Sequence, residues 1–345
     1  TAIIHSYPFR RLKHKTQVFF SPKNDHICTR IEHVMHVASI AAAVCRGLDL
    51  DADLAWAIGL GHDLGHTPFG HVGEKVMDRL KYENGLNGFI HELYSLRVVD
   101  YLARYGEGLN LTYAVRDGIV THCGEKFEHY IVPDAQIKDL EALTDRNSYP
   151  ATWEGAVVRM ADKIAYLGRD VEDAIQLKII EKEQLPKKAE RILGSTNSDI
   201  ISSLVEDLIA TSEKKGAVGF SDDVYEAMRE LKEFNYRNIY THSVLTDYHR
   251  YFERILHTLH RYLSDIFDRF GFDYERYKAE KNLLSVRFGD YVTKMKPFYE
   301  NVDGGYDEVV FDYLAGMTDD YALECVGEIM IPKKMEHKFD QFLLG

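Results

Sequence analysis

Residues 52–71, ADLAWAIGLGHDLGHTPFGH, join an almost wholly apolar segment to a stretch crowded with polar and small residues. The apolar part follows a cluster of cap-forming residues at 49–53, so it predicts a helix that is buried on all sides. The polar part, residues 61–71, holds three histidines, one aspartate and three glycines. Glycine loosens the backbone at a helix end, so several of these side chains can converge on one point.

Helical spacing of apolar residues continues through most of the chain, and alternating strand patterns are few. Residues 31–46 place five small or apolar side chains on one helix face. Further helices are expected at 90–105, 110–122, 153–181, 198–213, 222–240, 243–270, 274–293, 305–316 and 318–329. We therefore predict an all-α fold with a core at 1–180 and a helical extension at 181–345, which could also form one continuous unit.

Two segments carry weaker patterns. Residues 182–221, rich in lysine, glycine and serine, are expected to form loops around one helix. The tail from residue 331 starts with a proline-containing breaker and is expected to be a peripheral helix.

Composition narrows the class of protein. The 345 residues are 45% hydrophobic and 28% charged, as in ordinary globular proteins. The net charge of −13 argues against general affinity for nucleic acid, although it does not exclude a local basic groove. No apolar run is long enough to predict a membrane helix, and we expect no membrane partner. The four cysteines form no CxxC pair, and no signal segment is recognised, so a reducing, cytoplasmic location is expected.

The sharpest functional pattern combines four residues spread over the chain, which are His33, His62, Asp63 and Asp162. Histidine and aspartate ligands suit Mn, Fe, Zn or Mg. An adjacent His-Asp pair cannot point in one direction from a regular helix, but it can at a glycine-loosened helix end. A single histidine is usually an ordinary hydrogen-bonded residue, and only the combination indicates a metal site. His36 is expected to lie behind the ligands or in solvent.

These residues and several longer blocks resemble the HD phosphohydrolase superfamily. RIEH at 30–33, HDLGHTPFGH at 62–71 and Asp162-Lys163 are typical of that superfamily. Other segments narrow the resemblance to the dGTPase-like deoxynucleoside triphosphate triphosphohydrolases, which include the vertebrate dNTPase with SAM and HD domains. The segments are FRRLKHKTQVF (9–19), FGHVGE (69–74), GFIHELYSLRVV (88–99), GLNLTYAVRDGIVTH (108–122), ADKIAYLGRDVEDAI (161–175) and FDYLAGMTDDYAL (311–323).

The resemblance implies a reaction and a cofactor. Water would attack the α-phosphorus of a dNTP and release deoxynucleoside and intact triphosphate, with dGTP favoured on family grounds. A divalent metal ion, Mn, Mg or Fe and otherwise Zn or Co, would be held by His33, His62, Asp63 and Asp162. Residues 1–180 would form the metal phosphohydrolase core, and 181–345 would complete the substrate pocket and the oligomer contacts.

The resemblance also implies catalytic roles. The poor 5′-oxygen leaving group needs a proton, and His71 is the expected general acid. His91 and Glu92 would tune its protonation, and His66 would contact the phosphates. Many bacterial members have Asn and Gln at the positions of Glu92 and Tyr94. This departure resembles the vertebrate branch, and it bears on base specificity and regulation while leaving the reaction class unchanged.

Five further residues are expected to bind the substrate. Arg30 and Lys163 would contact the phosphates, because a guanidinium matches phosphate oxygens in a bidentate way. By resemblance, Gln17 would lie near the sugar or the α-phosphate. Tyr166 and Asp170 would hold the deoxyribose and disfavour ribonucleotides.

Several alternatives stay open at this stage. Without the resemblance, Tyr166 is equally well a core residue, Arg30 a surface charge and His122 a satisfied core histidine. Another HD hydrolase, acting on a nucleoside monophosphate, a cyclic nucleotide or an alarmone, would share the metal site. A catalytically silent nucleotide sensor is the second alternative. By resemblance we expect a homo-oligomer (dimer, tetramer or hexamer) and a nucleotide activator, while binding of single-stranded DNA is not indicated.

Overall fold

The computed structural model describes residues 1–20, 26–123, 126–302 and 304–331. Over these residues it contains fifteen α-helices and two strands of two residues each, which confirms the all-α prediction. The elements are α1 Tyr7–Arg11, α2 Arg30–Gly47, α3 Ala52–Gly61, α4 Gly70–Glu83, α5 His91–Arg97, α6 Tyr113–Val120, β1 Tyr130–Ile131, α7 Trp153–Gln176, α8 Lys187–Leu193, α9 Asn197–Lys215, β2 Val218–Gly219, α10 Asp222–Asn235, α11 Ser243–Phe270, α12 Tyr274–Ala279, α13 Leu283–Asn301, α14 Gly305–Ala315 and α15 Asp319–Met330. None of the described helices has the length and apolar character needed to cross a membrane.

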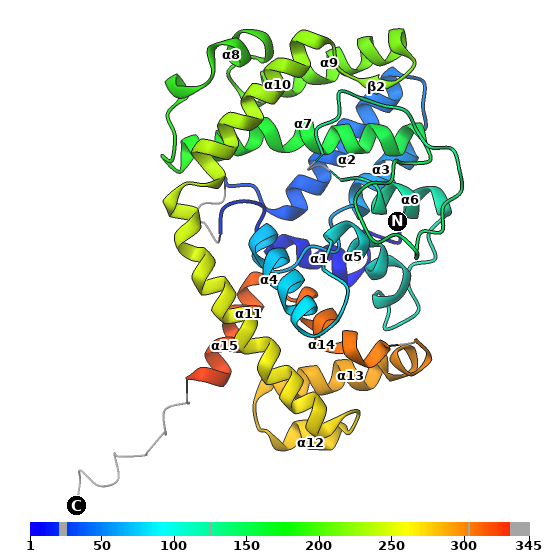
Figure 1. Cartoon of the computed structure of the whole chain (residues 1–345), viewed down its shortest axis with the longest axis vertical. Coiled ribbons are helices and arrows are strands. Elements are labelled where there is room, and N and C mark those ends of the chain that lie inside the picture. The colour runs from blue at the N-terminus through cyan, green and yellow to red at the C-terminus, as the bar shows by residue number, and fades with distance from the viewer. Residues whose placement is uncertain (21–25, 124–125, 303, 332–345) are drawn as a thin grey trace, which may run out of the picture.

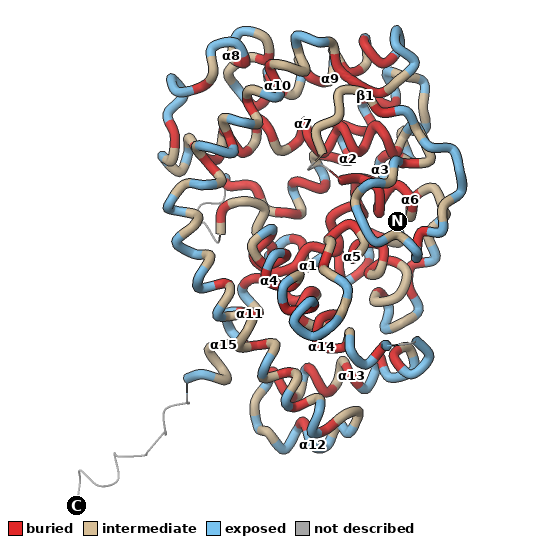
Figure 2. The backbone as a smooth tube through the Cα atoms, in the orientation of Figure 1, coloured by how far each residue is buried: buried red, intermediate tan, exposed pale blue. Residues whose placement is uncertain are grey.

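Helices α2, α3 and α7 pack together at the centre of the molecule, with α6 against α3 and α7. Helices α8, α9 and α10 cover one side of α7, whereas α12 and α13 lie at the opposite end of the molecule (Figure 1). The long α11 runs between these two ends and contacts α4, α14 and α15. Figure 2 shows that α2 and α7 are buried over much of their length, so the residues they carry inward are shielded from water.

Two hydrophobic clusters form the core. One joins α4 and α5 to α11, α13 and α14, and the other joins α2 and α7 to α8, α9 and α10. Each cluster draws residues from both sides of position 180, and the domain division at 180 stays a prediction.

Some predicted boundaries differ from the structure. The segment 274–293 contains two helices, because Lys281 adopts a left-handed φ of 57° and the Asn282 side chain caps α13 by accepting from Ser285 N. Residues 182–221 contain α8, the whole of α9 and β2 where one helix was expected. The expectation for the tail from 331 falls largely on residues 332–345, outside the described part of the chain.

Capping fixes the helices around the glycine-rich turn. Thr29 and Glu32 form a reciprocal capping box that starts α2, and the Asp51 carboxylate accepts from the first turn of α3. Helix α3 ends at Gly61, and α4 starts only at Gly70, where Phe69 and Gly70 adopt left-handed φ of 65° and 57°. The intervening residues 62–69 therefore form a tight, buried turn.

Gly65 allows this turn to press against α5. A Cβ at this position would lie 2.2 Å from Ser95 N and 2.5 Å from His91 O, and backbone atoms cannot swing aside. We expect Gly65→Ala to lower the free energy of unfolding by roughly 1–3 kcal/mol or more, as overpacking does. Gly327→Ala in α15 is the matched control, since no heavy atom lies within 4 Å of its Cβ position, and it should be neutral or stabilising by up to about 1 kcal/mol. Urea denaturation of both variants checks this, and an unchanged midpoint for Gly65→Ala would refute the close approach.

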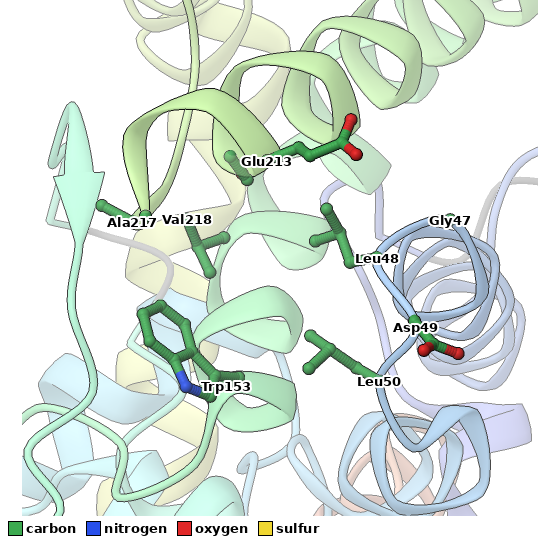
Figure 3. Close-up of a pocket in the computed structure, with 10 residues that line it drawn as sticks. Gly47, Leu48, Asp49, Leu50, Trp153, Glu213, Ala217 and Val218 are labelled. Atoms are coloured by element: carbon green, nitrogen blue, oxygen red, sulfur yellow. The ribbon is translucent and has the colours of Figure 1, made fainter.

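A small apolar pocket lies at the other end of α2. Figure 3 shows Leu48, Leu50, Trp153 and Val218 around it, with the Glu213 carboxylate at its edge. Gly47 follows His33 by 14 residues on the same helix, which corresponds to roughly 21 Å along the helix axis. This pocket is therefore remote from the glycine-rich turn.

Candidate metal centre and its flanking network

The four predicted ligands come together from three helices. His33 lies on α2, His62 and Asp63 follow α3, and Asp162 lies on α7, all of them buried. His33 Nε2 is 3.0 Å from Asp162 Oδ1, and His62 Nε2 is 3.5 Å from Asp63 Oδ1 and 3.9 Å from Asp162 Oδ1. One ligand atom each from His33, His62 and Asp63 lie within 4.8 Å of one another, which is compact enough for one ion.

Two observations fit a cation at this point. His62 Nδ1 contacts the carbonyl of Gly59 at 2.7 Å, so its Nε2 faces the cluster, where it is buried without a hydrogen-bond partner among the described residues. Burial alone would raise the pKa of Asp162, but the hydrogen bond and charge of His33 lower it to about 2. Buried carboxylates that stay charged beside an unsatisfied imidazole nitrogen form the donor set a divalent ion prefers.

Arg30 holds one of these carboxylates in place. Its Nη1 donates to Asp63 Oδ2 at 2.6 Å, and its Nε and Nη2 donate to the carbonyl of Thr16 at 3.1 and 2.9 Å. The side chain is only 1% exposed, so Arg30 is a buried partner of the metal-ligating turn. A surface role for this arginine is excluded by its burial.

A second group of histidines lies beside the cluster. The His66 ring stacks on His91 with ring centroids 3.9 Å apart, and its Nε2 is 3.3 Å from Asp63 Oδ1. His71 Nδ1 is 3.5 Å from Glu74 Oε2, and its side chain is 55% exposed. Of the predicted histidines in this group, His71 is therefore the one open to solvent.

His91 is held between two carboxylates. Its Nδ1 lies 3.0 Å from Glu74 Oε2 and 3.3 Å from Glu92 Oε2. Burial lowers the pKa of His91, but Glu92 and Glu74 outweigh burial and raise it to about 10. Arg146 closes the network, with Nη2 2.6 Å from Glu74 Oε1 and Nε 2.9 Å from Glu92 Oε1.

The sequence patterns assigned no role to Glu74 or Arg146. Glu74 follows His71 by three residues on α4, and that spacing is a signal that could have found it. Arg146 lies outside the regular elements, and no local motif marks it. His122, treated as a core histidine, contacts the carbonyl of Ile119 at 2.6 Å, while its Nε2 is 3.9 Å from Asp63 Oδ1.

The residues expected to bind substrate differ in their burial and in their hydrogen-bond partners. Asp170 is buried and accepts a hydrogen bond of 2.5 Å from Tyr240, while Tyr166, four residues before it, is half-buried. The Oε1 atom of Gln17 is buried without a hydrogen-bond partner among the described residues. Lys163 points away from the ligand cluster, since its Nζ donates to Glu128 Oε2 at 2.6 Å.

Comparison with known proteins finds a family model and a set of similar proteins. Residues 218–328 match the family model of a phosphohydrolase-associated domain. A deoxyguanosinetriphosphate triphosphohydrolase-like protein of Caldanaerobacter subterraneus subsp. tengcongensis is 38% identical over 330 residues, which cover 96% of this chain and 83% of the relative. A protein of the same description from Clostridium tetani is 37% identical over 341 residues, covering 96% and 84%. The chain belongs to the deoxyguanosinetriphosphate triphosphohydrolase-like family.

Membership of this family confirms the resemblance drawn from the sequence blocks. A relative from Desulfatibacillum aliphaticivorans, 38% identical over 336 residues, spans 96% of this chain and 86% of its own length, so the likeness includes both the glycine-rich turn and the C-terminal helices. The protein thus belongs to a family of metal-dependent HD phosphohydrolases. His33, His62 and Asp63 form one of four groups of His, Asp and Glu side chains among the described residues that could hold a metal ion.

Proposed function

We propose that this protein hydrolyses deoxynucleoside triphosphates to deoxynucleoside and inorganic triphosphate. The observation that carries the proposal is the convergence of the four buried ligands next to the solvent-facing His71. The family relatives, named for deoxyguanosine triphosphate, support dGTP as the favoured substrate. We further propose a homo-oligomer in the cytoplasm.

His33, His62, Asp63 and Asp162 would hold the divalent ion, with Mn, Mg or Fe as the preferred candidates. When bound, the ion supplies a more acidic water molecule and polarises an α-phosphate oxygen. Residues around the ligands hold them in orientation, since Arg30 fixes the Asp63 carboxylate and the carbonyl of Gly59 fixes the His62 ring.

The histidines and carboxylates beside the metal cluster would supply the proton that the leaving group needs. His71 is accessible and is the proposed general acid toward the 5′-oxygen. Glu74 Oε2 lies within 3.5 Å of His71 Nδ1, so this carboxylate orients the ring. His91 contacts Glu74 and favours its charged form, and Glu92 in turn contacts His91. His66 extends toward the phosphates from the metal side.

The sugar would lie against α7. Asp170 and Tyr166 are proposed to receive the deoxyribose, and Tyr240 joins them because it donates to Asp170. Gln17 has a buried, unsatisfied amide oxygen that suits a hydroxyl donor of the substrate. Lys163 would reach the phosphates only after leaving Glu128, so we propose that it contributes in the substrate complex alone.

Product analysis tests the proposed reaction. The protein is incubated with Mn and each of the four dNTPs or GTP, alone and in mixtures, and products are separated by ion exchange. Triphosphate with free deoxynucleoside supports the proposal, and the order of rates ranks base and sugar. Phosphate or pyrophosphate as the product would assign another HD hydrolase activity, and no turnover in any mixture would favour a silent sensor.

Asp170 provides a prediction on pH dependence. Burial raises the pKa of Asp170 to about 7, only partly offset by the hydrogen bond from Tyr240, so the folded protein binds a proton that the unfolded chain releases above about pH 4. This carboxyl therefore makes the free energy of unfolding fall between about pH 4 and 7. Asp170→Asn should remove that loss and raise stability above pH 7 by up to about 4 kcal/mol, while weakening deoxynucleotide turnover.

Denaturant unfolding of the metal-free protein at several pH values checks this expectation. Asp268→Asn, at an exposed position of α11, is the control and should leave the pH profile unchanged. Equal stability differences for Asp170→Asn at pH 4 and pH 8 would contradict the assigned burial.

A further inference from the structure

Arg146 lies in a long connector between β1 and α7. The connector, residues 132–152, contains no helix or strand, and every residue in it is described. Most of its side chains are exposed or half-buried, yet Arg146 turns inward to the carboxylates beside the metal cluster. Connectors of this length without secondary structure are uncommon in compact proteins and usually carry a function. An inward-pointing arginine in such a segment is therefore a candidate for a role in the site.

Arg146 bridges the two carboxylates on either side of His91. Its Nη2 donates to Glu74 Oε1 at 2.6 Å, and its Nε donates to Glu92 Oε2 at 3.0 Å. A guanidinium can serve both carboxylates at once because its N–H donors leave the side chain in a rigid, planar fork. Glu74 lies on α4 and Glu92 on α5, so the arginine links these two helices at the site.

The charges in this group balance only when Arg146 is present. The side chains of Glu74 and Glu92 are 8% and 1% exposed, and one imidazolium, His91, lies between them. Burial raises the pKa of Glu92, but His91, a further histidine and Arg146 outweigh burial and lower it. Arg146 therefore supplies the second positive charge for two buried carboxylates. Its removal would leave one buried negative charge uncompensated, which is unfavourable.

The backbone around Arg146 is held on both sides. The backbone N–H and the side-chain amide of Asn147 donate to the Asp145 carboxylate at 2.7 and 2.6 Å. The carbonyl of Ser148 accepts from Nη1 of Arg159 at 3.0 Å, and Arg159 is fully buried on α7. Supporting hydrogen bonds of this kind fix the geometry of a functional side chain. The connector thus presents Arg146 to the two carboxylates from a defined position.

Glu74 connects Arg146 to His71. Glu74 Oε1 accepts from Arg146 and, at 3.0 Å, from the backbone N–H of His91. Glu74 Oε2 lies 3.5 Å from His71 Nδ1 and 3.0 Å from His91 Nδ1. One carboxylate oxygen is therefore held from the connector while the other faces His71. A rotation of the carboxylate away from Arg146 would also take Oε2 away from His71.

We propose that Arg146 is a positioning residue for proton transfer to the leaving group. It holds Glu74 in the orientation and the charged form that keep the His71 ring aimed at the 5′-oxygen. The inference rests on the proposed function, because it assigns Arg146 to the general acid of that reaction. Arg146 itself touches neither the substrate nor the four candidate metal ligands in this account, so its effect reaches the reaction only through Glu74 and His71.

Steady-state release of triphosphate tests the inference, with Mn-loaded protein and whichever of the four dNTPs the parent cleaves fastest. Arg146→Ala should lower kcat roughly 10- to 100-fold, the usual loss when a residue that orients a functional side chain is removed. KM and metal content should stay near the parent values, because the lost interaction acts in the transition state. Arg116→Ala is the matched control, since Arg116 is 25% exposed against 24% for Arg146 and pairs with Glu141 of the same connector. It should keep the parent kcat.

Two readouts separate positioning from a purely structural role. Guanidinium chloride at millimolar concentration should restore part of the kcat of Arg146→Ala, because the vacated space is open to solvent. Sodium chloride at the same ionic strength should not. In a His71→Ala background, Arg146→Ala should lower kcat little further, since residues that act as a unit are not additive.

The outcomes distinguish this inference from the proposed function. An active parent whose Arg146→Ala variant keeps the parent kcat would overturn the inference alone. So would an equal loss in Arg116→Ala, which would assign the effect to tethering of the connector. A loss that guanidinium does not restore and that adds in full to the loss in His71→Ala would assign Arg146 a structural role. A parent protein that forms no triphosphate from any dNTP would overturn the proposed function and this inference with it.

Discussion

Replacing Asp63 with asparagine is expected to abolish metal binding and turnover together. Asp63 faces His62 and His66 and is the carboxylate that Arg30 fixes, so its charge is central to the donor set. Metal ions contribute several kcal/mol of transition-state stabilisation, and the loss in rate should be at least about three orders of magnitude. Metal content by mass spectrometry and turnover are measured on the same sample.

Asparagine is chosen because it keeps the volume and an acceptor for Arg30, whereas alanine would leave a buried arginine unpaired. Asp320→Asn, at an exposed carboxylate, is the control and should retain metal and rate. Full metal occupancy in Asp63→Asn would show that the ion is held without the Asp63 carboxylate.

His71→Ala is expected to retain the metal but lose roughly 10²- to 10⁴-fold in rate, the usual range for a general acid. His71 contacts Glu74, His66 and His91, and these three residues are not proposed ligands, so removal of the His71 ring should leave the donor set intact. The matched control is His14→Ala, since His14 has the same 55% side-chain exposure and lies outside the network. A His71→Ala protein that turns over at the parent rate would remove this residue from the mechanism.

Much of the fold was predictable because the helices are strongly periodic. The expected segment at 52–61 coincides with α3, and 243–270 coincides with α11. The boundary at Lys281 and Asn282 was missed because a left-handed residue followed by a cap interrupts the chain without interrupting the apolar pattern. Helix α4 was not predicted, although its start at Gly70 sets the position of Glu74.

The candidate site was predictable where a short sequence motif contains the residues that could bind a metal. His62 and Asp63 are neighbours at a helix end, and His33 and Asp162 face them from buried helices. The ion pair of Lys163 with Glu128 and the link from Arg146 to Glu74 and Glu92 depend on loop packing, which periodicity does not encode.

The most direct test of the proposed chemistry is hydrolysis of dGTP by the Mn-loaded protein in water enriched in oxygen-18, with mass spectrometry of both products. Attack of water on the α-phosphorus breaks the bond between that phosphorus and the 5′-oxygen, so one heavy oxygen should appear in triphosphate and none in deoxyguanosine. Label in deoxyguanosine, or in phosphate or pyrophosphate without any triphosphate, would contradict the account.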